Sequence, residues 1–477
     1  MPSVTVQTSK DPLVLHAYSQ DLWPRKLLEL RENGPLANPT VDQVFWPETA
    51  QEVAQVIAWA RDPENDAELY PYGAGSGVLG ATIPTPDSQR EGEPVGQKHR
   101  KRVVVDLKKM RKIRSLDRKS MTVWAEAGWI GENLERALNQ EGFTLGHFPS
   151  SIYCSSLGGY LATRSAGQLS TKYGKIEDMV LAVEFVLPNG TIAETGRAPR
   201  SAMGPDWTQL LMGSEGTLGF FTAACLQIQP LPEARVFMGF AAASVPQALE
   251  FTRALMQRGT RPAVLRILDP SETSLTLSSE AKKACDFSGN VAIVAVFEGT
   301  RRIVEAEAEE VREIAGKLEV KDFGPALGEH WWAHRYDVSY KQQLILSHNR
   351  MILDTFEVAA TWDLIEELYK NVKATSVGMG ILLAHFSHFY HTGANIYFTL
   401  VSHAGPFESA VDRYDVIWEN LLKSALASGA TLSHHHGVGT LKNLWLRREM
   451  GAWIQVFEKV KRALDPENRF NPSKMGL

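Results

Sequence analysis

The spacing of hydrophobic positions near the start of the chain indicates a helix followed by a strand. In residues 51–62 the spacing is helical, because Val53, Val56, Ile57 and Ala60 fall on one face. We expect helical structure up to about residue 65. A short strand then follows in the sequence AELYPYG, directly before a glycine-rich loop.

Further along, short apolar runs indicate strands. Residues 102–110 and 121–128 are rich in β-branched and apolar side chains, as buried strands are. Residues 130–142 form an amphipathic pattern that ends at a glycine, which predicts a helix. Residues 178–195 contain the turn sequence PNG between two apolar runs, which predicts a hairpin.

The pattern changes near residue 233, where longer strand and helix patterns begin to alternate as in an α+β layer. After residue 437 the pattern is helical again, and residues 463–474 form a terminal loop. We therefore expect an α+β protein with three parts: residues 1–232, 233–436, and a segment 437–477 that returns to the first domain.

Composition agrees with more than one folded unit. The chain has 477 residues, too many for one simple core, and 44% hydrophobic and 22% charged residues are values of a soluble globular protein. The net charge of −5 argues against a nucleic-acid binder. The three cysteines lie far apart, so they form neither a disulfide framework nor a CxxC metal site. The sequence starts without a signal pattern and has no apolar run of about 18 residues, so we expect a cytoplasmic protein.

Three loops rich in glycine and small hydroxyl residues stand out in the first part. They are PYGAGSGVLG (residues 71–80), PSSIYCSSLGGYLATRSAG (residues 149–167) and GSEGTLG (residues 213–219). The first is neither a dinucleotide-binding GxGxxG nor a nucleoside-triphosphate loop. Closely spaced glycines let backbone amides approach an anion such as a pyrophosphate. Three such loops favour a long polar ligand over three coincidental turns.

In this order, together with the sequence KYGKIEDMV, the loops resemble the FAD-binding domain of the vanillyl-alcohol-oxidase superfamily. The resemblance implies a PCMH-type domain built from two α/β subdomains, with the pyrophosphate at residues 73–78. Some members bind flavin covalently through a histidine in the first loop; Ser76 and Gly77 stand there in this chain, so we expect non-covalent FAD. The residues that the resemblance assigns to FAD are Pro71, Gly73, Ala74, Gly75, Ser76, Gly77, Val78, Pro149, Ser150, Ser155, Ser156, Gly158, Gly159, Ala162, Thr163, Ser165, Glu215, Gly216, Thr217 and Gly219.

The second half resembles the alkylglycerone-phosphate synthase family, the flavoenzymes of ether-lipid synthesis. The resemblance rests on RPAVLRILDP (261–270), HFSHFYHTGANIYFTL (385–400) and, above all, SHHHGVG (433–439). It implies an α+β substrate (cap) domain. It also implies exchange of the acyl group of acyl-dihydroxyacetone phosphate for a fatty alcohol through a flavin N5 adduct.

The same resemblance assigns catalytic roles. Tyr397 matches the catalytic tyrosine of the family, and Arg266 matches an arginine whose charge would favour the phenolate, because a free phenol has a pKa near 10. His435 and His436 match active-site histidines that relay protons, and His434 would orient them.

A metal site is the alternative for the histidines. Relatives that oxidise 2-hydroxy acids bind a metal near this hairpin, but Tyr397 and His435 stand where two of those ligands would be. His385 and His388 are three apart on an apparent strand, so they should point to opposite faces. Consecutive histidines also cannot converge on one ion in regular backbone. We therefore expect no metal.

The substrate phosphate is a second open point. Where the family has a basic residue, this chain has Gln342 or Gln343, so Lys341 or Arg350 would have to bind the phosphate. A lipid substrate also suggests peripheral membrane contact, with HWWAHRY (330–336) as an apolar rim, although packed tryptophans explain that sequence as well. We expect a homodimer.

Two other functions compete with the synthase. One is an FAD-linked oxidase or dehydrogenase of a hydroxy acid or alcohol. The other is a flavin-binding protein without turnover, against which Tyr397, Arg266 and the histidine run argue.

Overall fold

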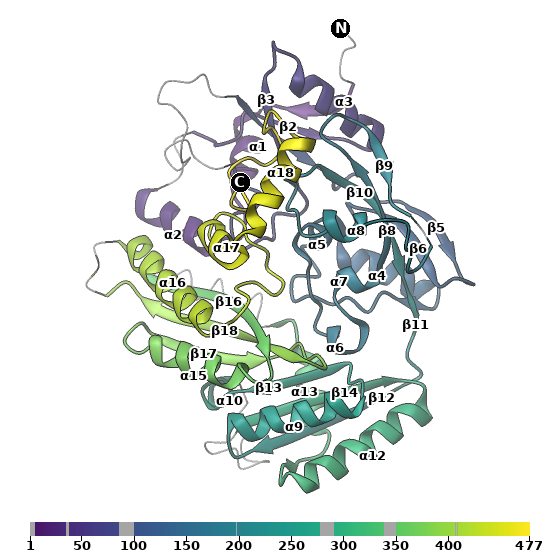
Figure 1. Ribbon diagram of the computed structural model, residues 1–477, viewed down its shortest axis with the longest axis vertical. Coiled ribbons are helices and arrows are strands. Elements are labelled where there is room, and N and C mark those ends of the chain that lie inside the picture. The colour runs from purple at the N-terminus through teal and green to yellow at the C-terminus, as the bar shows by residue number, and fades with distance from the viewer. Residues whose placement is uncertain are drawn as a thin grey trace.

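The computed structural model describes residues 5–34, 38–84, 100–196, 198–276, 291–337, 350–405, 407 and 409–477. One half of the molecule holds the chain up to about residue 230 together with the C-terminal helices, and the other holds the strands and helices between (Figure 1). Among the described residues, none of the helices combines the length and apolar character needed to cross a bilayer.

A four-stranded sheet forms the N-terminal part of the first half, in the order β1-β2-β4-β3. Strands β2 and β3 run parallel to β4, and β1 is antiparallel to β2. The predicted face of Val53, Val56, Ile57 and Ala60 is buried. The elements are β1 (Gln7–Ser9), α1 (Pro12–Ala17), α2 (Pro24–Asn33), β2 (Gln43–Trp46), α3 (Ala50–Arg61), β3 (Ala67–Tyr72) and β4 (Lys101–Asp106).

The expectation of an entirely helical start was wrong at β1 and β2. Both strands have only three or four residues, too few for an alternating pattern to show, and they are held by pairing with distant residues.

A five-stranded antiparallel sheet follows, in the order β5-β6-β10-β8-β9. The predicted hairpin of residues 178–195 is confirmed, because β8 pairs with β9 across a turn that places Gly190 at a φ of 86°. The strands are β5 (Ile113–Asp117), β6 (Thr122–Glu126), β8 (Val180–Val186), β9 (Ile192–Glu194) and β10 (Phe220–Gln227), and the helices are α4 (Gly131–Gln140), α5 (Leu157–Thr163), α6 (Ser170–Tyr173), α7 (Ile176–Met179) and α8 (Trp207–Leu211). The short strands β7 (Phe143–Thr144) and β11 (Gln229–Pro230) pair separately.

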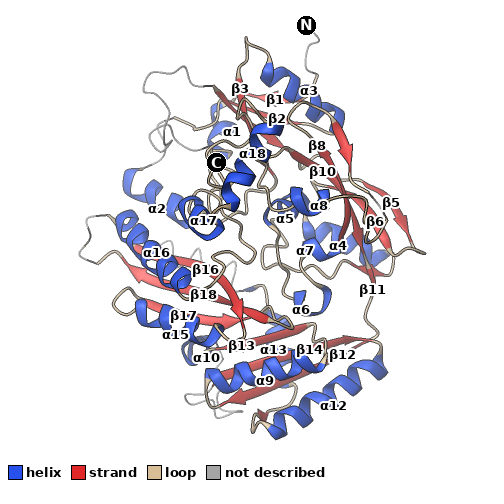
Figure 2. Ribbon diagram, in the orientation of Figure 1, coloured by secondary structure: helices blue, strands red, loops and turns tan. Residues whose placement is uncertain are grey.

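The second half is built on a seven-stranded antiparallel sheet in the order β15-β12-β14-β13-β17-β18-β16. Its strands are β12 (Ala234–Ala242), β13 (Val264–Leu268), β14 (Val291–Gly299), β15 (Lys321–Asp322), β16 (Met351–Thr361), β17 (Ile381–Phe386) and β18 (Gly393–His403). Helices cover one face (Figure 2): α9 (Val245–Arg258), α12 (Arg301–Lys317), α15 (Ile365–Thr375) and α16 (Ala410–Ala427). On the other face lie α10 (Pro270–Thr276) and α13 (Ala326–His334).

Side-chain alternation in these strands decides which side chains point away from the helix-covered core. Leu265 and Ile267 of β13 belong to the large core under the covering helices. Their neighbour Arg266 therefore points to the opposite face, since successive side chains of a strand alternate. The same period places Tyr397 opposite the buried Ile396 and Phe398 of β18.

The C-terminal segment contacts the first half through α17 (Asn443–Met450) and α18 (Trp453–Leu464). Lys461 of α18 is buried, and its Nζ donates to the carbonyls of Thr217 and Phe470, each at 2.8 Å. The Phe470 ring packs edge-on against Phe220 of β10, with centroids 5.5 Å apart. The predicted boundary at residue 233 falls between β11 and β12.

Candidate active site

A cavity of about 1060 Å³ lies between the glycine-rich loops of the first half and the face of the seven-stranded sheet that carries Arg266 and Tyr397. Its size matches that of sites for large organic ligands. All the residues that we assigned to FAD line it except Thr217, whose side chain is buried against the carbonyl of Ser214. Tyr397, Arg266, His435 and His436 line it as well, whereas His434 does not.

The first glycine-rich loop follows β3 and depends on two glycines. Gly75 has a φ of +68°, and a Cβ there would lie 2.1 Å from Tyr72 Oη. A Cβ on Gly73 would lie 2.2 Å from Ser156 Oγ, because the first and second loops touch at this point. Lys108 Nζ also donates to the carbonyl of Gly73 at 2.9 Å. Bare backbone thus lines the cavity where a pyrophosphate would lie.

The second loop leads into α5, where Ser156 is the N-cap residue and its Oγ accepts from Gly159 N at 3.3 Å. Gly158 packs against Ala127, whose carbonyl accepts from its amide at 2.7 Å. A Cβ on Gly158 would come 3.1 Å from the Ala127 side chain, so the small residues of this loop allow close packing beside the cavity.

The third loop binds another part of the chain. Glu215 is buried at a φ of 47°, and its carboxylate accepts from the amides of Val438 and Gly439, the latter at 2.9 Å. Burial raises the pKa of Glu215 above its ordinary value, although the two amides oppose the rise. The glutamate that we assigned to FAD therefore fixes the turn after the three histidines.

Tyr397 lies in a group of buried polar side chains. Its hydroxyl donates to Thr355 Oγ1 at 2.9 Å, and its ring stacks on His385 with centroids 4.8 Å apart. His385 Nδ1 lies 2.9 Å from Glu272 Oε1, and Arg266 Nη2 lies 3.6 Å from the same oxygen.

We expected Arg266 to lower the pKa of Tyr397, but the pKa is raised instead. Burial raises it to about 12, with Asp354 and Glu357 adding to the rise; Thr355 and Arg266 only partly oppose it. Arg266 is itself paired with Glu272, which weakens its effect on the phenol. At neutral pH, Tyr397 is therefore protonated.

The histidine run is held by Glu357 of β16, a fully buried carboxylate that sequence reasoning missed. It accepts from the amides of His434 and His436, the latter at 2.9 Å, and from Ser433 Oγ at 3.1 Å. Burial raises the pKa of Glu357, but Lys442, His436 and the amides outweigh it and keep the group ionised. Glu357 pairs with Tyr397 in the β16–β18 register.

Burial lowers the pKa of His436 to about 4 and that of His435 well below its usual value. Both rings are therefore neutral at pH 7 and can accept a proton. Within the described ranges, His436 Nδ1 and Arg266 Nε are buried without a hydrogen-bond partner. A ligand in the cavity would satisfy such atoms.

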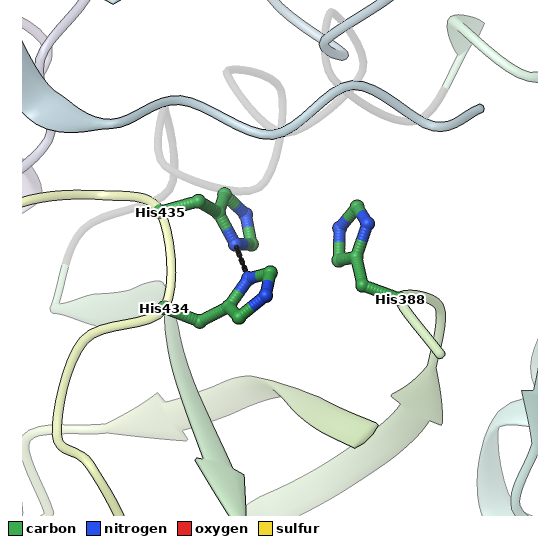
Figure 3. Close-up of side chains that lie close together, drawn as sticks. All are labelled: His388, His434 and His435. Atoms are coloured by element: carbon green, nitrogen blue, oxygen red, sulfur yellow. Dashed lines mark hydrogen bonds between the residues drawn. The ribbon is translucent and has the colours of Figure 1, made fainter. Parts of the chain in front are cut away.

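His385 and His388 both line the cavity, so the expectation that they point to opposite faces was wrong. Strand β17 ends at Phe386, and the strand period therefore does not extend to His388. His388 Nδ1 bonds Ser170 Oγ at 2.6 Å, and its ring lies 5.0 Å from the ring of His434 (Figure 3).

Of the two basic residues considered for the phosphate, only Arg350 is among the described residues, and it does not line the cavity. Lys341, with Gln342 and Gln343, lies outside the described residues. Arg350 is exposed before β16 and donates to the carbonyl of Phe407, away from the cavity. Arg335, from the HWWAHRY sequence, does line the cavity, as does Trp331; the Trp332 ring packs on Arg335 instead.

Two family models match the chain. The model of FAD linked oxidases, C-terminal domain, matches residues 231–475, and the FAD binding domain model matches residues 41–196. The chain belongs to the FAD-linked oxidases. FAD is its cofactor, and the loops that line the cavity are the part of the chain that would hold it.

Relatives define the branch. Alkyldihydroxyacetonephosphate synthase of Caenorhabditis elegans is 30% identical over 475 residues, covering 93% of this chain and 77% of the relative. A solved alkyldihydroxyacetonephosphate synthase structure has a TM-score of 0.80 at 27% identity, covering 98% of this chain and 82% of its own. p-Cresol methylhydroxylase shares the fold, with a TM-score of 0.76 at 16% identity, 98% coverage of this chain and 94% of its own. The chain is thus an FAD-dependent enzyme of the alkyldihydroxyacetonephosphate synthase type, with a PCMH-type FAD-binding fold.

Proposed function

We propose that the enzyme exchanges the acyl group of an acyl-dihydroxyacetone phosphate for a fatty alcohol. The observation that carries this proposal is the pairing, in one cavity, of a protonated phenol with neutral imidazoles. Tyr397 can donate a proton, and His435 and His436 can accept one. The names of the relatives supply the substrate class.

The exchange needs proton transfers but no net oxidation. The bond between the dihydroxyacetone carbon and the acyloxy oxygen breaks, and the fatty acid leaves as a carboxylate. The same carbon forms a new bond to the alcohol oxygen, and the alcohol proton is released. Bound FAD supplies an electron sink at the carbon that changes partner. The histidines accept protons at their ring nitrogens, and Thr355 Oγ1 fixes the direction of the Tyr397 hydroxyl. Positioned proton transfers contribute roughly 10²–10⁴-fold each.

The test supplies the purified enzyme with labelled fatty alcohol and acyl-dihydroxyacetone phosphate. We expect label in the product, one carboxylate released per label incorporated, and no electron acceptor consumed. If no label enters while a hydroxy acid bleaches the flavin without oxygen, the oxidase or dehydrogenase is the correct function. Relatives named D-lactate dehydrogenase (Arabidopsis thaliana, 27% identical) and glycolate oxidase subunit (Bacillus subtilis, 26%) represent that alternative.

We further propose that FAD is bound without a covalent link, because the first loop offers Ser76 and Gly77 to the cavity and no histidine. Denaturation should then release all the flavin into the supernatant. Homodimer formation and peripheral contact with a membrane stay predictions, which sedimentation velocity and vesicle cosedimentation measure.

A further inference from the structure

The lysine and arginine side chains that line the cavity, among the described residues, are Lys26, Arg31, Arg266 and Arg335. Two of them are neutralised by carboxylates. Glu29 Oε2 lies 3.0 Å from Lys26 Nζ, and Glu272 Oε1 lies 3.6 Å from Arg266 Nη2. Arg31 and Arg335 form no ion pair within the described ranges, so their charges are available to an anionic ligand.

The guanidinium group of Arg335 has one edge left for a ligand. Its Cζ lies 4.3 Å from the ring centroid of Trp332 and 4.6 Å from that of Tyr336, and Nη1 donates to the carbonyl of Trp332 at 2.6 Å. Nε is buried and has no hydrogen-bond partner in the part of the chain that the structure describes. Nε and Nη2 together form the edge that binds two oxygens of a phosphate or carboxylate side by side.

The backbone of Arg335 is tied to the flavin-binding half of the molecule. Gln168, which follows the second glycine-rich loop, donates from Nε2 to the carbonyl of Arg335 at 3.0 Å and to Ser150 Oγ at 3.2 Å. Ser150 is one of the residues that we assigned to FAD. Arg335 is therefore positioned before a ligand arrives, which lowers the entropy cost of binding.

Arg335 also lies on the side of the cavity that holds Arg266. Trp331 is four residues earlier on α13 and thus on the same helix face, and its ring centroid lies 5.8 Å from Arg266 Cζ. Helix α13 packs on β12 and β14, beside the strand β13 that carries Arg266 (Figure 1). Arg31 lies on α2, which packs on β16 at the opposite edge of the sheet.

We propose that Arg335 binds the phosphate of the substrate and selects a phosphate monoester over an uncharged analogue. This inference rests on the proposed exchange reaction, which supplies the substrate class. A phosphate monoester carries a charge of about −1.5 to −2 at pH 7, and two of its oxygens match the Nε–Nη2 edge. Arg335 thereby takes the role for which the sequence suggested Lys341 or Arg350.

The test titrates the FAD-loaded enzyme with dihydroxyacetone phosphate and measures binding by calorimetry. Arg335→Gln should weaken binding roughly 10- to 100-fold, because a two-point hydrogen bond to a charged group is lost. Arg335→Lys keeps the charge but not the planar fork, so it should recover only part of the affinity. Decanol, which has no phosphate, should bind to both variants as it does to the wild type.

Arg31→Gln is the matched control. Arg31 lines the same cavity, and its Nη1 is likewise buried without a hydrogen-bond partner among the described residues. This variant should bind dihydroxyacetone phosphate within about twofold of the wild type. Binding lost in Arg31→Gln and kept in Arg335→Gln would place the phosphate at α2 and overturn the proposal.

Two further outcomes separate this inference from the exchange reaction. If the wild type incorporates labelled alcohol and Arg335→Gln binds dihydroxyacetone phosphate as tightly as the wild type, the exchange stands and the role of Arg335 is wrong. If the wild type binds D-lactate but no dihydroxyacetone phosphate, the ligand is a carboxylate, and both the phosphate role and the exchange are wrong. The FAD content of each variant checks folding.

Discussion

The hydroxyl of Tyr397 gives the sharpest test at the scale of single residues. Tyr397→Phe removes one oxygen and its bond to Thr355 while the ring keeps its stacking on His385. We expect FAD to stay bound and turnover to fall roughly 10²–10⁴-fold, because a positioned proton donor is lost. Flavin absorbance and the labelled-alcohol assay measure the two effects.

Tyr369→Phe is the matched control. The Tyr369 hydroxyl also donates a hydrogen bond, to the buried carboxylate of Asp269 at 3.0 Å, but Tyr369 lies on α15 and does not line the cavity. Loss of this hydrogen bond should cost about 1 kcal/mol of stability. Turnover should stay within about threefold of the wild type, because Tyr369 does not line the cavity. Equal losses in the two variants would remove Tyr397 from the mechanism.

Asp354 predicts a pH dependence of stability. Burial raises its pKa from 3.8 to about 7, against bonds from Tyr414, Thr355 and Trp418 that lower it. The native carboxyl keeps its proton where the unfolded one has lost it. Its contribution to stability is therefore complete below about pH 3.8, declines as pH rises towards 7, and is absent above that.

Asp354→Asn should remove this dependence. Between pH 5 and 8 the free energy of unfolding of the wild type should fall relative to that of the variant. Urea denaturation at four pH values measures the difference. A constant difference between the two proteins across this range would mean that Asp354 does not titrate there.

Residue motifs predicted part of the site. Tyr397, Arg266, His435 and His436 follow from short sequences that can be matched one by one, and all four line the cavity. Glu357 could not be found in this way, because its role depends on strand pairing that sets it beside a turn 77 residues later.

At the scale of elements, the histidine turn is stabilised from both halves of the molecule. Glu357 holds it from β16 and Glu215 holds it from the third glycine-rich loop. Gly437 has a φ of +82°, and a Cβ there would meet Glu215 Oε1 at 2.2 Å. The two carboxylates therefore set the position of the histidines relative to the flavin loops.

Glu357→Ala should remove the hydrogen bonds that hold the histidine turn to β16. Two amides and a hydroxyl lose their acceptor, and Lys442, buried 3.5 Å from the carboxylate, loses its counter-charge. We expect a loss of about 3–5 kcal/mol in the free energy of unfolding and near-complete loss of turnover. Glu366→Ala on α15, which removes an exposed pair with Lys370, is the control and should cost about 0.5 kcal/mol or less.

Element types were predictable where the hydrophobic period was long. Helix α3 and the β8–β9 hairpin appear as expected. Strands β1 and β2 are too short to show a period, and the end of β17 at Phe386 is set by the following connection. That single boundary decides whether His388 faces His434, so a small error in element length changes the predicted chemistry.

At the scale of the whole molecule, the last residues of the chain join the glycine-rich loops to one another. Asn471 Nδ2 donates to the carbonyl of Glu215 at 2.6 Å and to that of Ala81 at 3.1 Å. Lys474 Nζ donates to the carbonyl of Gly80 at 2.8 Å. The sequence analysis placed a loop here, but long-range carbonyl contacts of this kind leave no pattern in the sequence.

Asn471→Ala should therefore weaken FAD binding without touching FAD, because Asn471 does not line the cavity. Two buried carbonyls lose their donor, which costs about 1–3 kcal/mol. If about half of this cost is relieved when FAD is absent, FAD affinity falls about two- to twelvefold, since 1.4 kcal/mol is a factor of ten. Fluorescence of released flavin on dilution measures the affinity.

Asn420→Ala, on the exposed side of α16, is the control and should release flavin as the wild type does. Unchanged affinity in Asn471→Ala would show that the loops keep their shape without the C-terminal segment.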